Sequence, residues 1–170
     1  MKSDSNITIK EVISSDELKK FVMFPHSLYK DSKYWVAPII KEELEILNKE
    51  TNPVFNNAIA HYFLAFIDGK IVGRIAALIN WIEVKDLKKK KVRFGWFDFI
   101  DDQNVSKALL EKVIEIGKKN NLEFIEGPVG FSNMDKAGML IKGFKKKNTM
   151  ITMYNYSYYP GHMKAHGYSK

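Results

Sequence analysis

The sequence predicts an α/β fold in which a mixed central sheet of about six strands is flanked by helices. A hairpin is the first observation behind this prediction. Apolar stretches at 61–67 and 71–79 flank Asp68-Gly69-Lys70, and an Asp-Gly pair supplies the positive φ angles that a tight turn needs. A third apolar and aromatic stretch follows at 92–100. These three segments predict an antiparallel front half of the sheet.

The second observation is a helix between two strands. Residues 103–120 carry Val105, Leu109 and Val113 at helical spacing, which predicts an amphipathic helix. Residues 122–128 have the composition of a strand. Two strands joined by a helix within one sheet normally form a right-handed parallel crossover. The back half of the sheet is therefore predicted to be parallel.

The N-terminal part predicts one strand and two helices. Residues 7–13 alternate apolar and polar, and Ser14-Ser15-Asp16-Glu17 is typical of a helix start. This helix is expected to stop near Phe24-Pro25, because proline disfavours helical geometry in the residue before it. A new segment is then expected to begin at His26. Apolar residues at helical spacing within 39–49 predict a second, short helix.

Composition bounds the class of protein. With 170 residues, 45% of them hydrophobic and 13% aromatic, the chain can bury a real core, so one domain over residues 1–170 is predicted and general disorder is excluded. The absence of cysteine excludes disulfides, thiolate zinc sites and a cysteine nucleophile. The histidines have no metal-ligand spacing, so no metal is expected. Because the N-terminus has no leader pattern and no run approaches about 20 apolar residues, we predict a cytoplasmic protein without a membrane partner.

Net charge leaves one rival class open. The 27 basic and 20 acidic residues give a formal charge of +7, which favours anionic partners. Lysine clusters at 88–91, 118–119 and 145–147 make the case for a nucleic-acid-binding module. Arg74 and Arg93 are the only arginines, however, and forks to bases and phosphates favour arginine. A nucleic-acid partner therefore ranks below a small phosphorylated one.

The first turn of the long helix reads Gln103-Asn104-Val105-Ser106-Lys107-Ala108. This segment and the element order resemble the GNAT superfamily of acyl-CoA-dependent N-acyltransferases. That family carries Gln/Arg-x-x-Gly-x-Gly/Ala at this place, and Ser106 stands in place of the first glycine. The first turn of a helix has free N–H groups and a positive dipole end, which suits a pyrophosphate. The alternative is an ordinary amphipathic helix after a strand. The resemblance implies that acetyl-CoA is the cosubstrate and is bound by Ile100, Gln103, Val105, Ser106, Lys107, Ala108 and Asn133.

The C-terminal part resembles a little-studied bacterial GNAT-like group more closely. The resemblance rests on residues 127–135, 138–144, 154–160 and 166–168, and in that group the chain usually continues into a second half. It implies an N-terminal half or a shortened relative, with a strand about to start at the C-terminus and the last strand of the fold missing. An open sheet edge would then favour a homodimer. Met163 stands where many GNAT members carry the tyrosine that protonates the leaving thiolate.

Aminolysis of a thioester needs a positioned amine, a path for its proton and an acid for the leaving sulfur. Asp98 is the one carboxylate within an apolar, aromatic strand, so we predict it as a base, with Glu126 comparable; an ion-paired or solvent-facing Asp98 is the alternative. Tyr154 and Tyr158 are predicted to donate a proton or to line the acceptor pocket, as Tyr159 could; aromatic packing is the alternative.

The resulting prediction is acetyl transfer from acetyl-CoA to an unidentified primary amine, by direct attack in a ternary complex. Its partners are thus acyl-CoA and an amine acceptor. Two alternatives stay open: a catalytically silent GNAT-like domain for CoA binding or assembly, and the basic nucleic-acid module. The acceptor cannot be derived from the sequence, because acceptor specificity is expected in variable loops.

Overall fold

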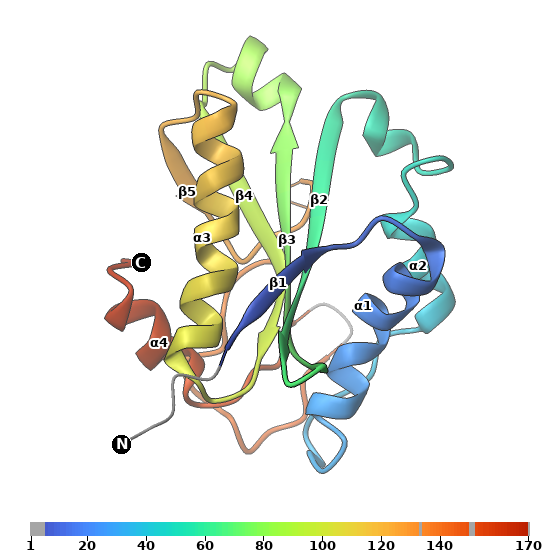
Figure 1. The fold of residues 1–170 in the computed structure, drawn as a ribbon, viewed down its shortest axis with the longest axis vertical. Coiled ribbons are helices and arrows are strands. Elements are labelled where there is room, and N and C mark those ends of the chain that lie inside the picture. Colours follow the sequence, from blue (N-terminus) through green and yellow to red (C-terminus); the bar gives the residue numbers. More distant parts are fainter. Residues whose placement is uncertain (1–5, 133, 150–151, 170) are drawn as a thin grey trace.

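A computed structural model describes residues 6–132, 134–149 and 152–169 and contains one five-stranded mixed sheet. The strand order is β1-β2-β3-β4-β5; the first four strands pair antiparallel, and β5 pairs parallel to β4 (Figure 1). The predicted mixed sheet is thus confirmed, with five strands where about six were predicted. The strands are β1 (Thr8–Glu11), β2 (Ala58–Ile67), β3 (Lys70–Asn80), β4 (Lys91–Phe99) and β5 (Phe124–Glu126).

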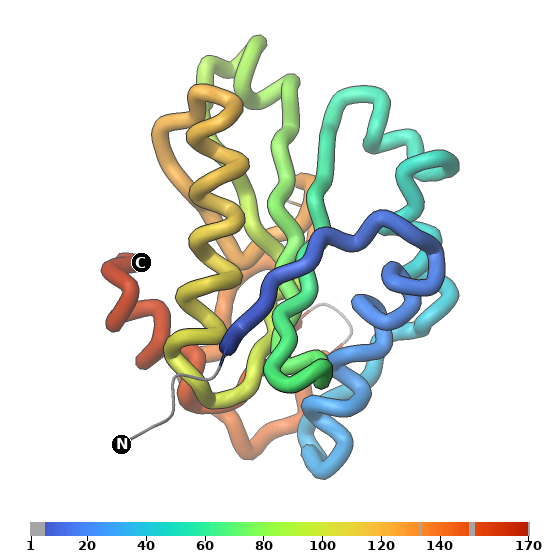
Figure 2. The backbone as a smooth tube through the Cα atoms, in the orientation of Figure 1, coloured from blue at the N-terminus to red at the C-terminus, as the bar shows by residue number. Residues whose placement is uncertain are grey.

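Helices cover both faces of the sheet. One apolar core forms where α3 packs on β2, β3 and β4, and a second forms on the opposite face beneath α1 and α2 (Figures 1 and 2). The short helix α4 lies beside the N-terminal end of α3 (Figure 1). The helices are α1 (Ser15–Leu28), α2 (Ile40–Leu47), α3 (Gln103–Lys119) and α4 (Tyr159–Ala165), with short turns η1 (Pro53–Asn56) and η2 (Ile82–Asp86).

The β2–β3 hairpin forms as predicted. Ile67 and Lys70 are partners across a two-residue turn. Asp68 and Gly69 both have positive φ, at 48° and 76°, which is the backbone geometry of a type I′ turn. In the next strand pair, β3 with β4, Arg74 lies opposite Asp98.

Helix α1 corrects one prediction: it continues past Pro25 to Leu28. A proline inside a helix has no N–H for the carbonyl four residues earlier, here that of Phe21. Arg74 donates from Nη1 to this carbonyl at 2.9 Å. A buried guanidinium from β3 therefore satisfies the group that Pro25 leaves without its helical donor, so α1 can continue through the proline. Tyr29, which ends α1, is thereby held inside the fold.

A bulge in β4 changes which face its side chains occupy. Arg74 pairs with Asp98, but Ala76 pairs with Gly95, so β4 has one extra residue, and Trp96 has a φ of 45°. Such a bulge shifts the side-chain alternation of the strand by one. Phe94 and Phe97, three residues apart, both join the core beneath α3, while Asp98 points to the α1 face. Without the bulge Asp98 would point towards α3.

Strand β5 stays beside β4 only briefly. The pairing runs from Lys91 with Phe124 to Arg93 with Glu126, and Val129 then donates from its N–H to the Phe94 carbonyl at 2.8 Å. The following chain turns away from the lower half of β4 (Figure 2). The two strands therefore diverge at the point where the bulge lies.

This divergence depends on the missing side chain of Gly95. A Cβ built on Gly95 would lie 2.5 Å from the Val129 carbonyl oxygen, so the backbone after β5 would have to move. We expect Gly95→Ala to lower the free energy of unfolding by about 1–3 kcal/mol, as measured by urea denaturation. Gly161→Ala is the matched control: a Cβ at Gly161 in α4 meets nothing within 4 Å, so it should be neutral or stabilising by up to about 1 kcal/mol. Equal effects of the two substitutions would contradict this explanation.

The C-terminal part differs from the prediction. Where a strand was expected to begin near residue 166, the chain forms α4 and then a turn at Gly167, which has a φ of 82°. Pro160 lies in the first turn of α4, a position at which proline favours a helix start. No sixth strand follows within residues 152–169.

Candidate functional site

Asp98 is the centre of a buried polar cluster beneath the bulge. Arg74 donates from Nε and Nη2 to the same carboxylate oxygen, Oδ2, at 2.8 Å each. Tyr29 donates its hydroxyl proton to the other oxygen, Oδ1, at 2.9 Å. Asp98 and Arg74 are 9% and 5% exposed. Both carboxylate oxygens thus accept hydrogen bonds from buried donors. This is the ion-paired arrangement that was the alternative to Asp98 acting as a base.

Two tyrosine hydroxyls continue the cluster to the edge of the sheet. The hydroxyls of Tyr29 and Tyr159 are 2.8 Å apart. Since Tyr29 gives its proton to Asp98, Tyr159 donates to Tyr29 and accepts the Phe99 N–H at 3.1 Å. Burial, followed by the Asp98 charge, raises the pKa of Tyr29 and Tyr159 well above 10. Both hydroxyls therefore stay protonated at neutral pH, and Tyr159 occupies a hydrogen-bonding position on β4 that β5 has left.

The neighbouring tyrosines follow the same edge. Tyr158 is half-buried and donates its hydroxyl to the Phe99 carbonyl, and burial, with Asp101 as the next cause, raises its pKa. Tyr154 is buried against the Tyr29 ring, with centroids 5.7 Å apart, and donates to the Phe144 carbonyl at 3.3 Å. The segment from Tyr154 to Tyr159, here named the tyrosine segment, thus lies along the end of β4 beyond its pairing with β5.

The first turn of α3 presents two different surfaces. Asp102 caps the helix by accepting the Asn104 N–H at 2.8 Å. Gln103, Asn104 and Lys107 are exposed, whereas Ser106 is fully buried, as is Val105. The exposed side carries amide and ammonium donors next to the positive end of the helix dipole, which suits an anionic group. The buried side faces the core and α4.

Ser106 lies in a relay of polar groups that ties α4 to α3. Its hydroxyl is 2.9 Å from His162 Nδ1 and 2.8 Å from His166 Nε2, and the other nitrogen of His162, Nε2, is 2.9 Å from Asp101 Oδ1. Asp101 can only accept, so we assign the proton on His162 Nε2 to that bond. Ser106 then donates to His162 and accepts from His166, or donates to the Gln103 carbonyl when His162 is protonated on both nitrogens.

This relay has the residue types of a nucleophile triad, but it lacks access. Ser106 has no exposed surface, and its oxygen is already within hydrogen-bonding distance of three groups. We therefore interpret the relay as the contact that fixes α4 against the first turn of α3. Met163, on the same short helix, packs against the core beneath α3.

The contact between α4 and α3 is expected to weaken in acid. Burial, then His162 and Lys107, lowers the pKa of His166 below its ordinary value of 6.5, and Glu111 opposes this weakly. A base whose folded pKa is lowered stabilises the fold fully above its unfolded pKa and loses that contribution as the pH falls below it. We expect the free energy of unfolding to fall between about pH 7.5 and about pH 5.5 by more in the wild type than in His166→Gln. Parallel pH profiles, measured by urea denaturation, would contradict this assignment.

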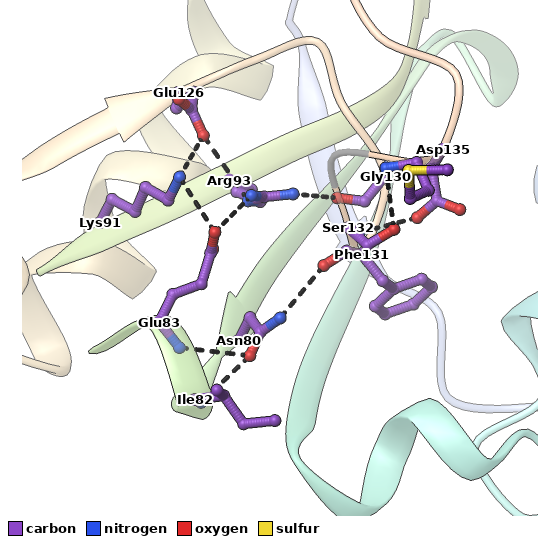
Figure 3. A network of polar contacts seen from close by, with 11 residues as sticks. Asn80, Ile82, Glu83, Lys91, Arg93, Glu126, Gly130, Phe131, Ser132 and Asp135 are labelled. Atoms are coloured by element: carbon purple, nitrogen blue, oxygen red, sulfur yellow. Dashed lines mark hydrogen bonds and ion pairs between the residues drawn. The ribbon is translucent and has the colours of Figure 1, made fainter. Parts of the chain in front are cut away.

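A buried ion network holds the upper part of the β4–β5 junction (Figure 3). Glu83 Oε1 lies 2.6 Å from Arg93 Nη2 and 3.3 Å from Lys91 Nζ, and Lys91 also reaches Glu126 at 2.6 Å. Arg93 donates to the Gly130 carbonyl at 3.3 Å, which anchors the chain leaving β5. Beside it lies a shallow hollow lined by Glu126, Gly127, Pro128, Val129, Ala137 and Gly138.

The structure brings together some of the sequence-predicted residues and separates others. Asp98 lies at the end of β4, and the Tyr158 hydroxyl contacts the neighbouring Phe99 carbonyl. The exposed Gln103 and Lys107 lie on the helix turn that follows. Tyr154 is turned towards Phe144 instead. Ile100 and Ala108 are half-buried, Val105 and Ser106 are inside, and Asn133 lies outside the described residues.

Sequence reasoning missed the partners of Asp98 and Ser106. The only sequence signal for Arg74 is Pro25, which leaves a helical carbonyl without its usual donor, and no comparable signal marks Tyr29. His162 and His166 have the i, i+4 spacing that places two side chains on one helix face, which was a visible signal. Within the described residues, no group of three or more His, Cys, Asp or Glu side chains is placed to hold a metal ion.

Sequence comparison finds two curated bacterial relatives. The chain is 31% identical to protein YghO of Escherichia coli (strain K12) over 162 residues, which is 95% of this chain and 41% of the relative. It is 25% identical to the bacterial ceramide synthase of Caulobacter vibrioides (strain NA1000 / CB15N) over 169 residues, 99% of this chain and 44% of the relative. The chain thus spans about two fifths of the length of these relatives. No protein-family model matches the sequence.

Structural comparison decides the fold. A predicted acetyltransferase from Clostridium acetobutylicum, solved with acetyl-CoA, superposes with a TM-score of 0.59 at 12% identity, covering 96% of this chain and 90% of that one. The chain has the GNAT fold. An aminoglycoside acetyltransferase from an uncultured soil metagenomic sample, solved with sisomicin, gives a TM-score of 0.51 at 18% identity over 71% of this chain and 75% of that one.

The GNAT fold confirms the predicted fold class, an acyl-CoA N-acyltransferase architecture with an antiparallel front and a parallel crossover behind. Among the described helices of this chain, none is long and apolar enough to cross a membrane.

Proposed function

We propose that this chain is an acyl-CoA-dependent N-acyltransferase domain that transfers an acyl group to a primary amine by direct attack in a ternary complex. The observation that carries the proposal is the divergence of β5 from β4 next to the exposed first turn of α3, in a chain with the GNAT fold. The tyrosine segment lies along this gap, and its Tyr158 and Tyr159 hydroxyls bond the Phe99 backbone at the edge of β4.

The residues of the first α3 turn fit the phosphates of acyl-CoA. Gln103 and Asn104 offer amide donors, and Lys107 offers an ammonium group whose contact with Glu111 is long, at 3.9 Å, and exposed. They lie at the positive end of a 17-residue helix, where the dipole favours an anion, although the Asp102 carboxylate already accepts the Asn104 N–H there. We assign Gln103, Asn104 and Lys107 to phosphate binding, with Ile100 and Ala108 beside them. Val105 and Ser106 support this turn from within.

The reaction needs one proton donor and one proton path from the chain. The amine nitrogen attacks the thioester carbonyl carbon, the N–C bond forms, the C–S bond breaks, and the leaving thiolate takes a proton. Tyr158 is the candidate donor, because its half-buried hydroxyl lies at the end of β4, where release from the Phe99 carbonyl would let it reach the leaving sulfur. The proton lost by the amine passes to water at the open side of the gap.

Asp98 is better suited to position the tyrosines than to accept a proton. Its oxygens accept bonds from Arg74 and Tyr29, and Tyr159 reaches Phe99 of β4 through Tyr29. We therefore propose Asp98 as a positioning residue. Its role as a base stays a prediction, as does the role predicted for Tyr154.

The relative named as a bacterial ceramide synthase, which is matched over 99% of this chain and 44% of its own length, supports one acceptor class. Ceramide formation joins a fatty acyl group to the amine of a long-chain amino alcohol. We propose that the acceptor here is an amine of this class and that the donor is a long-chain acyl-CoA. Acetyl transfer, the prediction from the sequence, is the competing outcome.

The absence of cysteine gives a clean test of this proposal. Release of CoA can be followed with a chromogenic disulfide, because the protein contributes no thiol of its own. The purified chain is incubated with acetyl-CoA or palmitoyl-CoA and either sphinganine or a short primary amine, and the N-acyl product is identified by mass spectrometry. Amine-dependent CoA release with the matching amide supports the proposal. No amide from any pair, in a chain that binds acyl-CoA, would refute it.

A chain that binds acyl-CoA but forms no amide would fit the alternative function, a catalytically silent acyl-CoA-binding or assembly domain. One observation favours it: α4 is fixed against the first turn of α3, and Met163 of α4 is a side chain that cannot donate a proton. Binding without turnover, unchanged by Tyr158→Phe, would support this alternative.

A further inference from the structure

Two loops from distant parts of the sequence form one surface at the end of the molecule where α1 stops. Residues 30–39 connect α1 to α2, and residues 141–149 precede the tyrosine segment. Asn148 joins them, since its N–H donates to the Tyr34 carbonyl at 3.2 Å and its Oδ1 accepts the Val36 N–H at 2.7 Å. We name these two loops the basic loop face; both lie at the bottom of Figure 1.

The second of these loops is held in place from within. Leu140 exchanges two hydrogen bonds with the buried Asn155, at 2.7 and 3.1 Å, and the Phe144 carbonyl accepts the hydroxyl of the buried Tyr154. With these anchors and Asn148, the side chains between them are presented outwards. Ile141, Lys142 and residues 145–147 are exposed.

The basic loop face combines positive charge with aliphatic side chains. Its two loops contain six lysines and one acidic residue, Asp31. In the parts of the chain that the structure describes, none of these lysines has a carboxylate within 4.0 Å. Val36, Ile39 and Ile141 are 43%, 60% and 45% exposed. The six lysines are Lys30, Lys33, Lys142, Lys145, Lys146 and Lys147.

We propose that the basic loop face binds the surface of an anionic phospholipid bilayer. Lysines near such a surface are attracted to its headgroups, and exposed aliphatic side chains among them can enter the boundary between headgroups and acyl chains. The proposal goes beyond the acyl-transfer function and does not require it. It replaces the sequence-based expectation of no membrane partner with contact at the surface, without any spanning segment.

Charge chemistry favours a bilayer over nucleic acid here. The only two arginines, Arg74 and Arg93, are buried in ion pairs, so no arginine fork is available to bases or phosphates. The exposed apolar side chains of the face are aliphatic, and its aromatic residues Tyr34, Trp35 and Phe144 are half-buried, whereas single-stranded nucleic acid is bound by exposed aromatic rings. Exposed lysine ammonium groups with aliphatic neighbours fit a lipid surface better.

The face also adjoins the candidate site. Tyr29, which directly precedes Lys30, contacts both Trp35 of the first loop and Tyr154 of the tyrosine segment, with ring centroids 5.3 and 5.7 Å apart. Its hydroxyl is bonded to Asp98. A bilayer bound here would therefore lie next to the end of β4, where an apolar substrate drawn from that bilayer would arrive.

Vesicle sedimentation tests the proposal with the whole chain. We compare vesicles of phosphatidylcholine with vesicles containing phosphatidylglycerol as well, for wild type and for Lys145→Gln with Lys146→Gln and Lys147→Gln. Because each lysine near an anionic surface contributes a factor of about five, we expect this variant to partition about a hundredfold more weakly. The matched control replaces Lys89, Lys118 and Lys119 by Gln; these exposed lysines belong to the turn before β4 and to the end of α3, at the top of Figure 1.

A second variant tests the aliphatic contribution. Val36→Ser with Ile141→Ser should weaken partitioning without changing net charge, while Ile114→Ser, at an exposed position on α3, should not. Equal losses in both lysine variants would show nonspecific charge attraction and overturn the proposal. So would the absence of sedimentation with anionic vesicles, or binding of DNA through Lys145–Lys147 without binding of vesicles.

Discussion

Asp98→Ala is expected to destabilise the protein by about 3–5 kcal/mol. The substitution leaves the Arg74 guanidinium buried with its positive charge uncompensated, and removal of one partner of a buried ion pair has a cost of this size. It also removes the acceptor of the Tyr29 hydroxyl. Urea denaturation followed by far-UV circular dichroism measures the free energy of unfolding directly.

The partner variants show whether the cost comes from the unpaired charge. Arg74→Met combined with Asp98→Leu removes both charges, so it should cost much less than Asp98→Ala alone. The residual cost comes from the Phe21 carbonyl, which loses its Arg74 donor, and from the Tyr29 hydroxyl, which loses its Asp98 acceptor. Glu45→Ala is the surface control: its pair with Lys41 is 3.8 Å long and exposed, so about 0.5 kcal/mol or less is expected. A cost below about 1 kcal/mol for Asp98→Ala would contradict the ion-pair assignment.

Tyr158→Phe is expected to lower kcat by about 10² to 10⁴, the usual contribution of a general acid. The Phe99, Tyr156 and His162 rings would still contact the new side chain, so the fold and acyl-CoA binding should be retained. The measurement is the CoA-release assay, in single-turnover form, with binding determined separately by calorimetry.

Tyr156→Phe is the matched control for Tyr158. Its hydroxyl is bonded to the Leu28 carbonyl at 3.1 Å, on the α1 side of the segment and away from β4, so kcat should change by no more than about twofold, the effect of a weak structural hydrogen bond. Equal losses in the two variants would mean that the tyrosines act only through packing. An unchanged kcat in Tyr158→Phe would remove Tyr158 from the reaction.

The parts of the fold that could be predicted are those set by local sequence. The β2–β3 hairpin follows from one Asp-Gly pair, and α3 from its wide apolar face. The end of α1 could not be predicted, because the donor that lets the helix continue through Pro25 is Arg74, some fifty residues along the chain. Helix α4 was missed because its partner is Ser106 on α3, a contact that exists only after folding.

The candidate site was likewise predictable only where local sequence determines it. Asp98 and Tyr158 stand out in the sequence as a carboxylate in an apolar strand and as one of four clustered tyrosines. The bulge at Trp96 turns Asp98 to the α1 face, and no local signal predicts an extra residue in β4. Ser106 was predicted to face phosphate, but the α3 packing face includes it, so it is buried beside His162. The predicted homodimer stays a prediction.

Calorimetric titration with acyl-CoA tests the central claim, that the first turn of α3 is the acyl-CoA site. The wild-type chain is titrated with acetyl-CoA and palmitoyl-CoA at low and moderate salt, beside Gln103→Ala with Lys107→Glu. Lys118→Glu is the control, because it makes the same charge change at the opposite end of α3. We predict saturable binding that is lost in the first variant and retained in the control at both salt concentrations. Absence of binding by a folded chain, or equal weakening by both variants, would contradict the account.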